Sequence, residues 1–423
     1  MYSLKVLKVP WLSLLLVVCC ASQSSAQRQA NVWYFGKHIG IDFNSGSPQL
    51  LSSPNIVLAE GCASIADRKT GELLFYTNGR TVWNREHRVM ENGEGLLGHW
   101  SSTQSALIVP DPGDSLRYYL FTADAQPYEY RGNREISGIN YSLVDMRLGD
   151  GLGALLEKNS PLFSDTATEK LAATQHANGR DFWIVAHEWN SDRFFAWLLT
   201  PNGIEDTVIS ATGSVYDDPH TGKGTIGYLK ISPNGKLLAA AATFGALGVE
   251  LFDFDAHTGR ISNPRQIISP EANLYVYALS FSPRSCKLYL GADSIRNAIA
   301  QYDVSSGEIE DILKSRKVIY QSPFLGQGIG NSAYQIGPDG KIYSPLLGSW
   351  LSSIAYPDAD GIACGYNPQA LYLGDDAVAG LGLPNMIDSW FAREGGCSPP
   401  RLEPFTKDTV ICVGSIARFQ APW

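Results

Sequence analysis

The side chains with the most reactive chemistry in this sequence surround one short segment. Gln175 and His176 come first, and His187 and Glu188 follow after an apolar stretch. An imidazole beside a carboxylate can hold a metal ion or transfer protons as an acid and a base. However, the first two residues enter a turn and the last two end a strand-like stretch. We therefore expect structural hydrogen bonds here, and we keep only His176 as a candidate ligand-binding residue.

Two pairs of aspartates have the spacing seen at the start of calcium-binding loops. Asp253 with Asp255, and Asp358 with Asp360, stand two residues apart. Neither pair continues to the bidentate glutamate that completes an EF-hand. Turn-forming aspartates explain both pairs better, and they also explain the polar loop 217–220 (DDPH). We expect no metal site and no cofactor. The alternative is that one of these aspartate loops binds calcium.

Aromatic side chains on connections are better candidates for ligand binding. Most of the 10 Trp and 20 Tyr residues stand on apolar strands, where packing between sheets is their default role. Trp100, Trp189 and Trp350 stand on connections instead, where a ring could stack on a sugar. With His176 they form the candidate ligand-binding set. No catalytic residue is assigned, because the sequence has no Gly-x-Ser-x-Gly elbow and no complete phosphate loop.

A repeat of short strands must position these residues, because helical periodicity is scarce. The repeating unit is an apolar strand, a turn rich in Pro, Asn, Asp and Gly, and a second apolar strand. Its clearest copies are residues 231–238 (ISPNGKLL), 281–289 (FSPRSCKLY) and 336–343 (IGPDGKIY), and looser copies are 66–75, 109–121 and 175–183. Successive turns stand 50 to 56 residues apart, which fits a four-stranded propeller blade.

The outer half of each unit can also be predicted. Residues 248–255 alternate as a third strand, and 260–268 follow as a fourth strand after a turn. Residues 300–308 repeat the third strand and its turn one unit later. Six units of this kind run from about residue 60 to residue 373.

The chain ends supply a seventh unit. Residues 379–388 (AGLGLPNMID) are predicted as an innermost strand without partners, and 31–35 and 40–43 as outer strands without an inner one. Pairing the two ends closes a seven-bladed β-propeller and removes exposed sheet edges. Burial of apolar side chains such as Trp33 and Met386 should stabilise this closure more than the strand hydrogen bonds do.

The predicted innermost strands carry a mixed polar set, Glu60, Gln104, His176, Lys230 and Asn385. Propeller enzymes gather several acidic residues or histidines at this place. Here no two obvious metal ligands face one another, so we expect a protein that is not an enzyme. An extracellular hydrolase or lactonase that uses the central funnel is the alternative.

The first 26 residues have the features of an export signal. Lys5 and Lys8 precede the apolar run 11–20, and residues 24–26 offer a cleavage site. Lipidation at Cys19 is the rival interpretation. The run is too short to span a bilayer, and we expect no membrane span. A net charge of −9 without a basic stripe argues against nucleic acid as a partner.

Five cysteines remain after such a leader. They are Cys62, Cys286, Cys364, Cys397 and Cys412. None of them forms a C-x-x-C pair, which makes a zinc ribbon an unsuitable interpretation. Export permits disulfides, but the spacing does not say which cysteines pair, and the odd number leaves at least one without a partner in this chain.

A set of motifs along nearly the whole chain resembles one protein family. The motifs are residues 31–36 (NVWYFG), 60–65 (EGCASI), 74–79 (LFYTNG), 82–84 (VWN), 90–93 (MENG), 102–106 (STQSA), 382–386 (GLPNM) and 390–391 (WF). In this order they resemble the N-terminal β-propeller of large secreted proteins from gliding bacteria. Those proteins continue into PKD or immunoglobulin-like repeats and end in a gliding-motility-associated domain, the type IX secretion sorting signal.

The resemblance implies an organisation and a function. A signal peptide (1–26) precedes a seven-bladed β-propeller (27–396), and residues 397–423 form a linker and the incomplete start of a PKD or immunoglobulin-like β-sandwich. The expected function is a non-catalytic secreted or cell-surface module for binding or adhesion. Its expected partners are an extracellular glycan or protein ligand and, in the full-length protein, downstream PKD domains.

Overall fold

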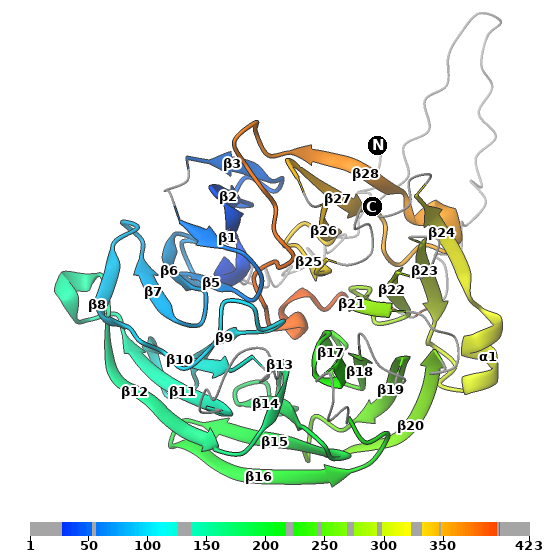
Figure 1. Cartoon of the computed structure of the whole chain (residues 1–423), viewed down its shortest axis with the longest axis horizontal. Coiled ribbons are helices and arrows are strands. Elements are labelled where there is room, and N and C mark those ends of the chain that lie inside the picture. The colour runs from blue at the N-terminus through cyan, green and yellow to red at the C-terminus, as the bar shows by residue number, and fades with distance from the viewer. Residues whose placement is uncertain are drawn as a thin grey trace, which may run out of the picture.

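The computed structural model shows an all-β chain whose sheets stand around a common centre in a propeller-like ring (Figure 1). It describes residues 28–52, 56–125, 137–216, 223–242, 248–268, 275–293, 298–322, 332–346, 348–395 and 397. The predicted signal peptide, the loop 217–220 and the predicted PKD-like segment lie outside the described residues. Within those ranges no helix is long and apolar enough to cross a membrane.

Five sheets of four strands and one sheet of eight strands make up the ring. The first sheet holds β1 (Val32–Lys37), β2 (Ile39–Asp42), β3 (Gln49–Leu51) and β4 (Val57–Leu58). The eight-stranded sheet holds β5 (Ala63–Ala66), β6 (Leu73–Thr77), β7 (Thr81–Asn84), β8 (Val89–Glu94), β9 (Ala106–Asp111), β10 (Asp114–Ala123), β11 (Ile139–Asp145) and β12 (Ala154–Phe163).

The four remaining sheets follow in chain order, each running from its first strand at the centre to its fourth strand at the rim (Figure 1). They are β13 (Ala167–Gln175), β14 (Phe182–Glu188), β15 (Arg193–Thr200), β16 (Gly203–Ala211); β17 (Leu229–Ile231), β18 (Leu237–Ala242), β19 (Gly248–Phe254), β20 (Ile261–Ile268); β21 (Tyr275–Phe281), β22 (Lys287–Asp293), β23 (Ala298–Asp303), β24 (Lys317–Gln321); and β25 (Gln335–Ile336), β26 (Ile342–Leu346), β27 (Trp350–Ile354), β28 (Tyr366–Tyr372). Helix α1 (Ile309–Lys314) precedes β24.

The predicted hairpin turns are confirmed. In each of the three clearest copies, the turn joins the first and second strands of one sheet. Gly235, Ser285 and Gly340 close these turns with positive φ, and each donates its backbone N–H to the carbonyl oxygen three residues earlier. The predicted third and fourth strands near residues 248–255 and 260–268 are also confirmed as β19 and β20.

The prediction of seven separate sheets differs from the structure, because two expected sheets merge. The order β5-β6-β7-β8-β12-β11-β10-β9 places two meanders edge to edge at their outer strands. A single parallel residue pair, Glu91 with Ala154, joins β8 to β12. The Asn92 side chain strengthens this seam by donating to the Leu155 carbonyl oxygen at 3.1 Å.

The two chain ends meet, but not by the regular strand that was expected. Residues 379–388 are not the innermost strand of the first sheet, because β4 takes that place beside β1. The C-terminal segment instead makes isolated bridges from Val378 to Lys37 and from Pro384 to Cys62. Pro384 has no N–H to donate, which prevents a continuous ladder through this segment.

Burial at the junction of the chain ends is as predicted. Trp33, Phe35 and Met386 are buried in one hydrophobic cluster, and Ile387 is buried in the neighbouring one. The Trp33 ring also packs edge-on against Tyr343 of β26, with ring centroids 5.9 Å apart. The tryptophan-rich start and the segment near residue 385 therefore share one core.

Two glycines let the C-terminal segment approach the chain just before β5. A Cβ atom on Gly382 would lie 1.8 Å from the Glu60 carbonyl oxygen, and one on Gly380 would lie 2.1 Å from the Ala59 carbonyl oxygen. Real Cβ atoms do not come this close to backbone. Because the segment comes so close to residues 59 and 60, the Leu381 N–H can donate to the Ala59 carbonyl oxygen at 2.9 Å.

A disulfide settles the pairing that the sequence left open. Cys286, in the β21–β22 turn, is bonded to Cys397, with Cα atoms 5.3 Å apart. Closing a loop of roughly 100 residues stabilises a fold by about 4–5 kcal/mol in the chain-entropy account. Cys62 and Cys364 are free and buried, and Cys412 lies outside the described residues. The disulfide ties the end of the C-terminal segment to the ring.

We expect Gly382→Ala to destabilise the protein strongly. The new methyl group must push the segment away from Glu60, which strains packing and weakens the flanking backbone hydrogen bonds, a loss of about 3 kcal/mol or more. Denaturant unfolding measures the change. Gly46→Ala is the control for a methyl group that meets no neighbour, because no atom lies within 4 Å of its Cβ position; its φ of +85° adds a backbone cost of about 1 kcal/mol, which should be smaller than the loss at Gly382. Equal losses in the two variants would show that the close approach is unimportant.

Candidate functional site

Successive turns of an antiparallel meander lie at opposite ends of its strands. The turns of all the sheets therefore gather on two opposite faces of the ring. The first-turn face carries the turns between first and second strands, such as residues 232–236 and 337–341. The second-turn face carries the turns between second and third strands, such as 78–80, and the connections from an outer strand to the next inner strand, such as 95–105. Each candidate site described below lies on one of these two faces or at the centre of the ring.

A pocket of about 440 Å³ opens on the second-turn face, and we call it the Trp100 pocket. Its lining comes from the residues around β4, the β6–β7 turn and the β8–β9 connection: Val57, Ala59, Asn78, Arg80, Thr81, Gly95 and Trp100. Trp100 is 50% exposed, so half of a large apolar side chain is available to a ligand. The prediction that this tryptophan stands on an accessible connection is therefore consistent with its position.

Backbone contacts hold the two loops of the Trp100 pocket together. The Gly98 N–H donates to the Gly79 carbonyl oxygen at 3.0 Å, and the Ser105 hydroxyl donates to the Asn78 carbonyl oxygen at 3.0 Å. The Asn78 side-chain oxygen accepts the backbone N–H groups of Arg80 and of the next residue, both at 3.0 Å. The pocket is thus formed before a ligand arrives.

The groups around the Trp100 pocket suit a hydroxylated ring that carries an acid. Arg80 is exposed and makes no ion pair with the described residues, and a guanidinium can bind a carboxylate through two parallel hydrogen bonds. The oxygen of the Asn78 amide is occupied, which leaves its NH₂ group to donate. Trp100 adds an aromatic surface of the kind that combines apolar contact with polar neighbours.

The other predicted ligand-binding residues do not join Trp100. Trp189 is half-buried in the connection after β14. Trp350 is the first residue of β27 and not part of a connection, which corrects that prediction, and its half-buried ring packs on a tyrosine of β28 with centroids 4.9 Å apart. His176 lies just beyond β13 on the first-turn face, where its Nε2 atom is 3.0 Å from the His257 carbonyl oxygen. His176 is therefore not on an innermost strand, which corrects that prediction.

The fold separates the reactive side chains that the sequence places around the β13–β14 hairpin. His176 and His187 lie at opposite ends of the hairpin, because β13 and β14 pair antiparallel along their length. Glu188 forms an ion pair with Arg193, with one contact of 2.7 Å. Gln175 donates its side-chain amide to a carbonyl oxygen of its own turn. The structural interpretation of this cluster is the one that fits.

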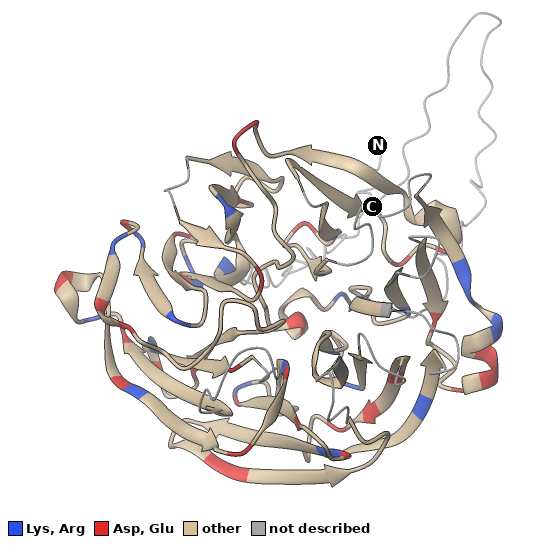
Figure 2. Ribbon diagram, viewed as in Figure 1, with Lys and Arg blue, Asp and Glu red and all other residues tan. Residues whose placement is uncertain are grey.

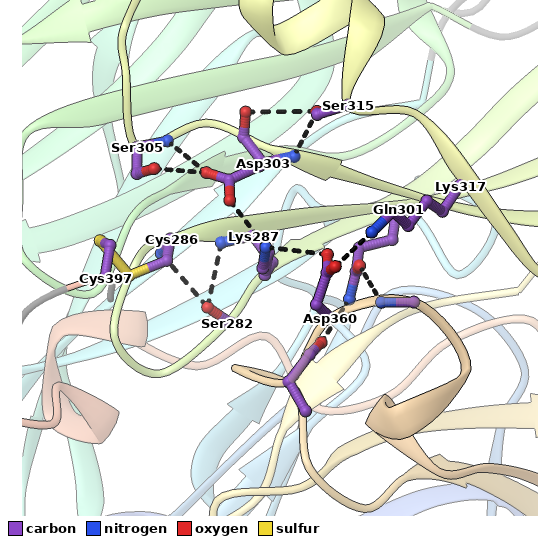
Figure 3. A network of polar contacts seen from close by, with 12 residues as sticks. Ser282, Cys286, Lys287, Gln301, Asp303, Ser305, Ser315, Lys317, Asp360 and Cys397 are labelled. Carbon is purple, nitrogen blue, oxygen red and sulfur yellow. Dashed lines mark hydrogen bonds and ion pairs between the residues drawn. A yellow bond between two sulfur atoms is a disulfide. The ribbon is translucent and has the colours of Figure 1, made fainter. Parts of the chain in front are cut away.

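The second pair of candidate calcium-binding aspartates belongs to an ion-pair network between two sheets. Figure 3 shows Lys287 of β22 between Asp303 and Asp360, with Nζ–oxygen distances of 2.7 and 3.2 Å. Lys317 forms a further ion pair with Asp360. The carboxylate charge of Asp360 is thus balanced by lysines and serves to join β21–β24 to the β27–β28 connection.

The first pair of candidate aspartates is also occupied. Asp253 pairs with Arg265, and Asp255 accepts the backbone N–H of His257 at 2.9 Å as a turn-forming aspartate. Within the described ranges, no group of three or more His, Cys, Asp and Glu side chains could hold a metal ion. The turn interpretation therefore holds for Asp255, while Asp253 and Asp360 form ion pairs. Asp358 accepts the Arg284 backbone N–H at 3.0 Å.

The centre of the ring is crossed by the C-terminal segment, drawn in orange in Figure 1. Its Asp388 meets the buried Lys230 at 3.3 Å, and Gln335 of β25 bonds both, at 2.7 Å to the lysine and 2.9 Å to the aspartate. Burial lowers the pKa of Lys230, and the Asp388 charge opposes that shift. Asp388 was missed from the sequence, although a lysine on a short apolar strand signals that a buried partner must exist.

Gln104 and Asn385, two other residues of the predicted interior set, do meet at the centre. Their side chains are joined at 3.3 Å, and Asn385 also donates to the Leu171 carbonyl oxygen at 2.8 Å. Glu60 accepts the Tyr277 hydroxyl at 2.7 Å, and burial with this nearby acid raises the pKa of Tyr277. These hydrogen bonds connect the C-terminal segment and the innermost strands to one another.

Two further buried ionisable side chains, Lys170 and His187, lie between the sheet of β13–β16 and the sheet of β17–β20. Lys170 donates to the Thr225 carbonyl oxygen at 2.8 Å, and burial lowers its pKa to about 7. The His187 ring lies between Phe194 and Tyr216, with centroids 4.3 and 4.2 Å away, and neither of its nitrogens has a hydrogen-bond partner among the described residues. Burial and the nearby lysine lower the pKa of His187 to about 3.

Charged residues of both signs are mixed around the ring (Figure 2). Lys and Arg segments alternate with Asp and Glu segments along the outer strands and turns that this view shows. Such a distribution gives no extended field of one sign to steer a polyanion or polycation.

Comparison with known proteins supports the fold alone. The sequence matches no family model and no curated protein. A solved structure of a putative 6-phosphogluconolactonase from Bacteroides fragilis aligns with a TM-score of 0.52 at 12% identity, over 85% of this chain and 98% of that one. A KlHsv2 structure with loop 6CD replaced by a Gly-Ser linker aligns with a TM-score of 0.42 at 10% identity, over 77% and 89% of the two chains.

We expect stability to decrease as the pH falls from 6.5 towards 3, partly because of His187. Its folded pKa is below the ordinary 6.5, so unfolding takes up a proton across this window, at roughly 1 kcal/mol per pH unit. His187→Leu should flatten the dependence between pH 7 and 5, measured by denaturant unfolding at each pH. His176→Leu, in the same hairpin, is the control for replacing a histidine with a leucine. Identical slopes in the wild type and the His187 variant would contradict this assignment.

Proposed function

We propose that the protein is a non-catalytic binding module, secreted or displayed at the cell surface, that binds a glycan bearing an acidic group in the Trp100 pocket. The observation that carries this proposal is the half-exposed indole of Trp100 beside the exposed guanidinium of Arg80 in a pocket of about 440 Å³. Ligand pockets typically combine one apolar surface with a few polar groups that fix orientation. The loops around this pocket are already bonded to each other.

The export and architecture in this proposal have separate support. The disulfide between Cys286 and Cys397 suits an oxidising compartment. Counting the two halves of the eight-stranded sheet as separate blades gives the seven-bladed ring of the secreted family that the sequence resembles. By the same resemblance, we place this chain at the head of a larger protein with PKD-type domains. Adhesion is the role that such a position suggests.

A lactonase or hydrolase that uses the central funnel is the second candidate, and one observation favours it. The similar Bacteroides fragilis structure is described as a putative 6-phosphogluconolactonase, although a likeness at this identity concerns the fold. Against it, the central side chains of Lys230, Gln335, Asn385 and Asp388 are committed to hydrogen bonds with this chain itself. A substrate entering there would have to break those bonds.

We expect the chain to bind acidic glycans on an array and in titration calorimetry, with binding that survives chelation. Trp100→Ala should weaken binding at least tenfold, since truncating a central aromatic contact commonly costs about 2 kcal/mol. Arg80→Gln should weaken binding of acidic glycans and leave neutral ones nearly unchanged. Trp350→Ala is the matched control, because that ring packs on Tyr372 away from the pocket.

Two results would contradict the proposal. One is wild-type affinity in the Trp100 and Arg80 variants. The other is turnover of a lactone or glycan that is lost on substitution of a central residue such as Asp388 while the Trp100→Ala protein keeps it. The second result would support the enzyme instead.

A further inference from the structure

A larger pocket, about 520 Å³ in volume, lies on the first-turn face, opposite the Trp100 pocket. Three stretches of the chain form it: residues near the N-terminal end of the described chain, the 337–340 turn of the last sheet, and residues 389–393 after the C-terminal segment has crossed the ring. We call it the Arg393 pocket. It exists because the two chain ends come together.

The Arg393 pocket has excess positive charge. Arg28 and Arg393 both line it, and neither forms an ion pair with the described residues. Its lining carboxylate is Asp339, whose side chain is only 7% exposed. Asp339 accepts the Tyr343 hydroxyl at 2.8 Å and pairs with Lys341 at 3.1 Å, so its charge is already balanced. Two guanidinium groups remain without a counter-charge.

The Arg393 guanidinium contacts the 337–340 turn. It lies close to Gly340, where a Cβ atom would be 1.9 Å from its Nη2 atom. Nη2 donates to the Asp339 carbonyl oxygen at 2.9 Å, which uses one of five N–H donors. The Arg393 backbone N–H donates to the Pro283 carbonyl oxygen at 3.0 Å, and the disulfide at Cys397 holds the chain just beyond.

Two neighbours complete the donor set. The Ser389 hydroxyl oxygen accepts the Gln175 backbone N–H at 3.1 Å, so its own proton is free to be donated into the pocket. Trp390 contributes a half-buried indole to the lining. The pocket thus offers fixed donors, two positive charges and one aromatic surface.

We propose that the Arg393 pocket binds a small organic anion, one that presents a carboxylate or a phosphate group to Arg28 and Arg393. Guanidinium groups bind such oxyanions through paired, charge-assisted hydrogen bonds, and Ser389 supplies a further donor. The site is separate from the Trp100 pocket and does not depend on the function proposed there. Its formation requires the closed ring, since its two arginines come from opposite ends of the described chain.

Titration calorimetry on the purified chain at low salt tests this site. The probes are succinate for a carboxylate source, inorganic phosphate for a phosphate source, and neutral glycerol; none of them has a sugar ring that suits the Trp100 pocket. We expect the anions to bind and glycerol not to, and the tighter of the two anions identifies the group that the site prefers. Raising the salt to about 0.5 M should weaken binding, because exposed charge pairs are screened.

Arg28→Gln and Arg393→Gln should each weaken anion binding at least tenfold. Arg393→Lys should also weaken it, since an ammonium keeps the charge but loses the paired donors. Arg180→Gln is the matched control, because Arg180 lies on the same face but is paired with Asp181. Melting curves of each variant verify that the fold is kept.

The proposal is overturned if neither anion binds the wild-type chain, or if the Arg28 and Arg393 variants bind as the wild type does. It is also overturned if anion binding is lost in Trp100→Ala and kept in Arg393→Gln, since the anion would then occupy the other pocket. Failure of glycan binding at the Trp100 pocket, with anion binding intact, would contradict only the function proposed for that pocket.

Discussion

The passage of residues 378–388 through the centre of the ring is the constraint on which the other features depend. Gly382 allows backbone contact with Glu60, and Asp388 supplies the charge that the buried Lys230 needs. A buried ammonium without a partner would cost several kcal/mol. The segment also reaches both pockets. Leu381 is bonded to Ala59, which lines the Trp100 pocket, and the residues directly after Asp388 line the Arg393 pocket.

The two pockets use the same ring in different ways. The Trp100 pocket lies between loops of neighbouring sheets, and backbone bonds between those loops shape it. The Arg393 pocket lies where the chain ends meet, and the contact of the Arg393 guanidinium with the 337–340 turn helps to shape it. In both cases the strands form the scaffold, and the residues that are proposed to bind a ligand lie outside the strands. This division of labour is common in β-proteins, since strands are committed to packing while loops are free to vary.

Local patterns in the sequence were sufficient for the turns and most of the strands, but not for residues 379–388, which form isolated bridges instead of a strand. They also selected Trp100 as a candidate. The three clearest hairpin turns carry Gly or Ser at the position of positive φ, and period-two alternation marks β19. Trp100 was found because a large aromatic side chain on a connection has no sheet to pack in. The same reasoning selected Trp350, which packs on Tyr372 instead. A single sequence does not distinguish these two cases, because the difference lies in a contact with another strand.

By itself the sequence determined the all-β class and the repeating hairpins, since these follow from short-range turn chemistry and apolar alternation. The meeting of the chain ends was predicted in a different way, from expected strands at both ends that had no partners. Only the tertiary structure decided that two expected sheets share an edge, that Cys286 pairs with Cys397, and that Asp388 meets Lys230. It likewise decided that Arg28 and Arg393 share a pocket. Each of these joins residues more than 60 positions apart, and such contacts depend on how the sheets pack around the centre, which no local pattern encodes.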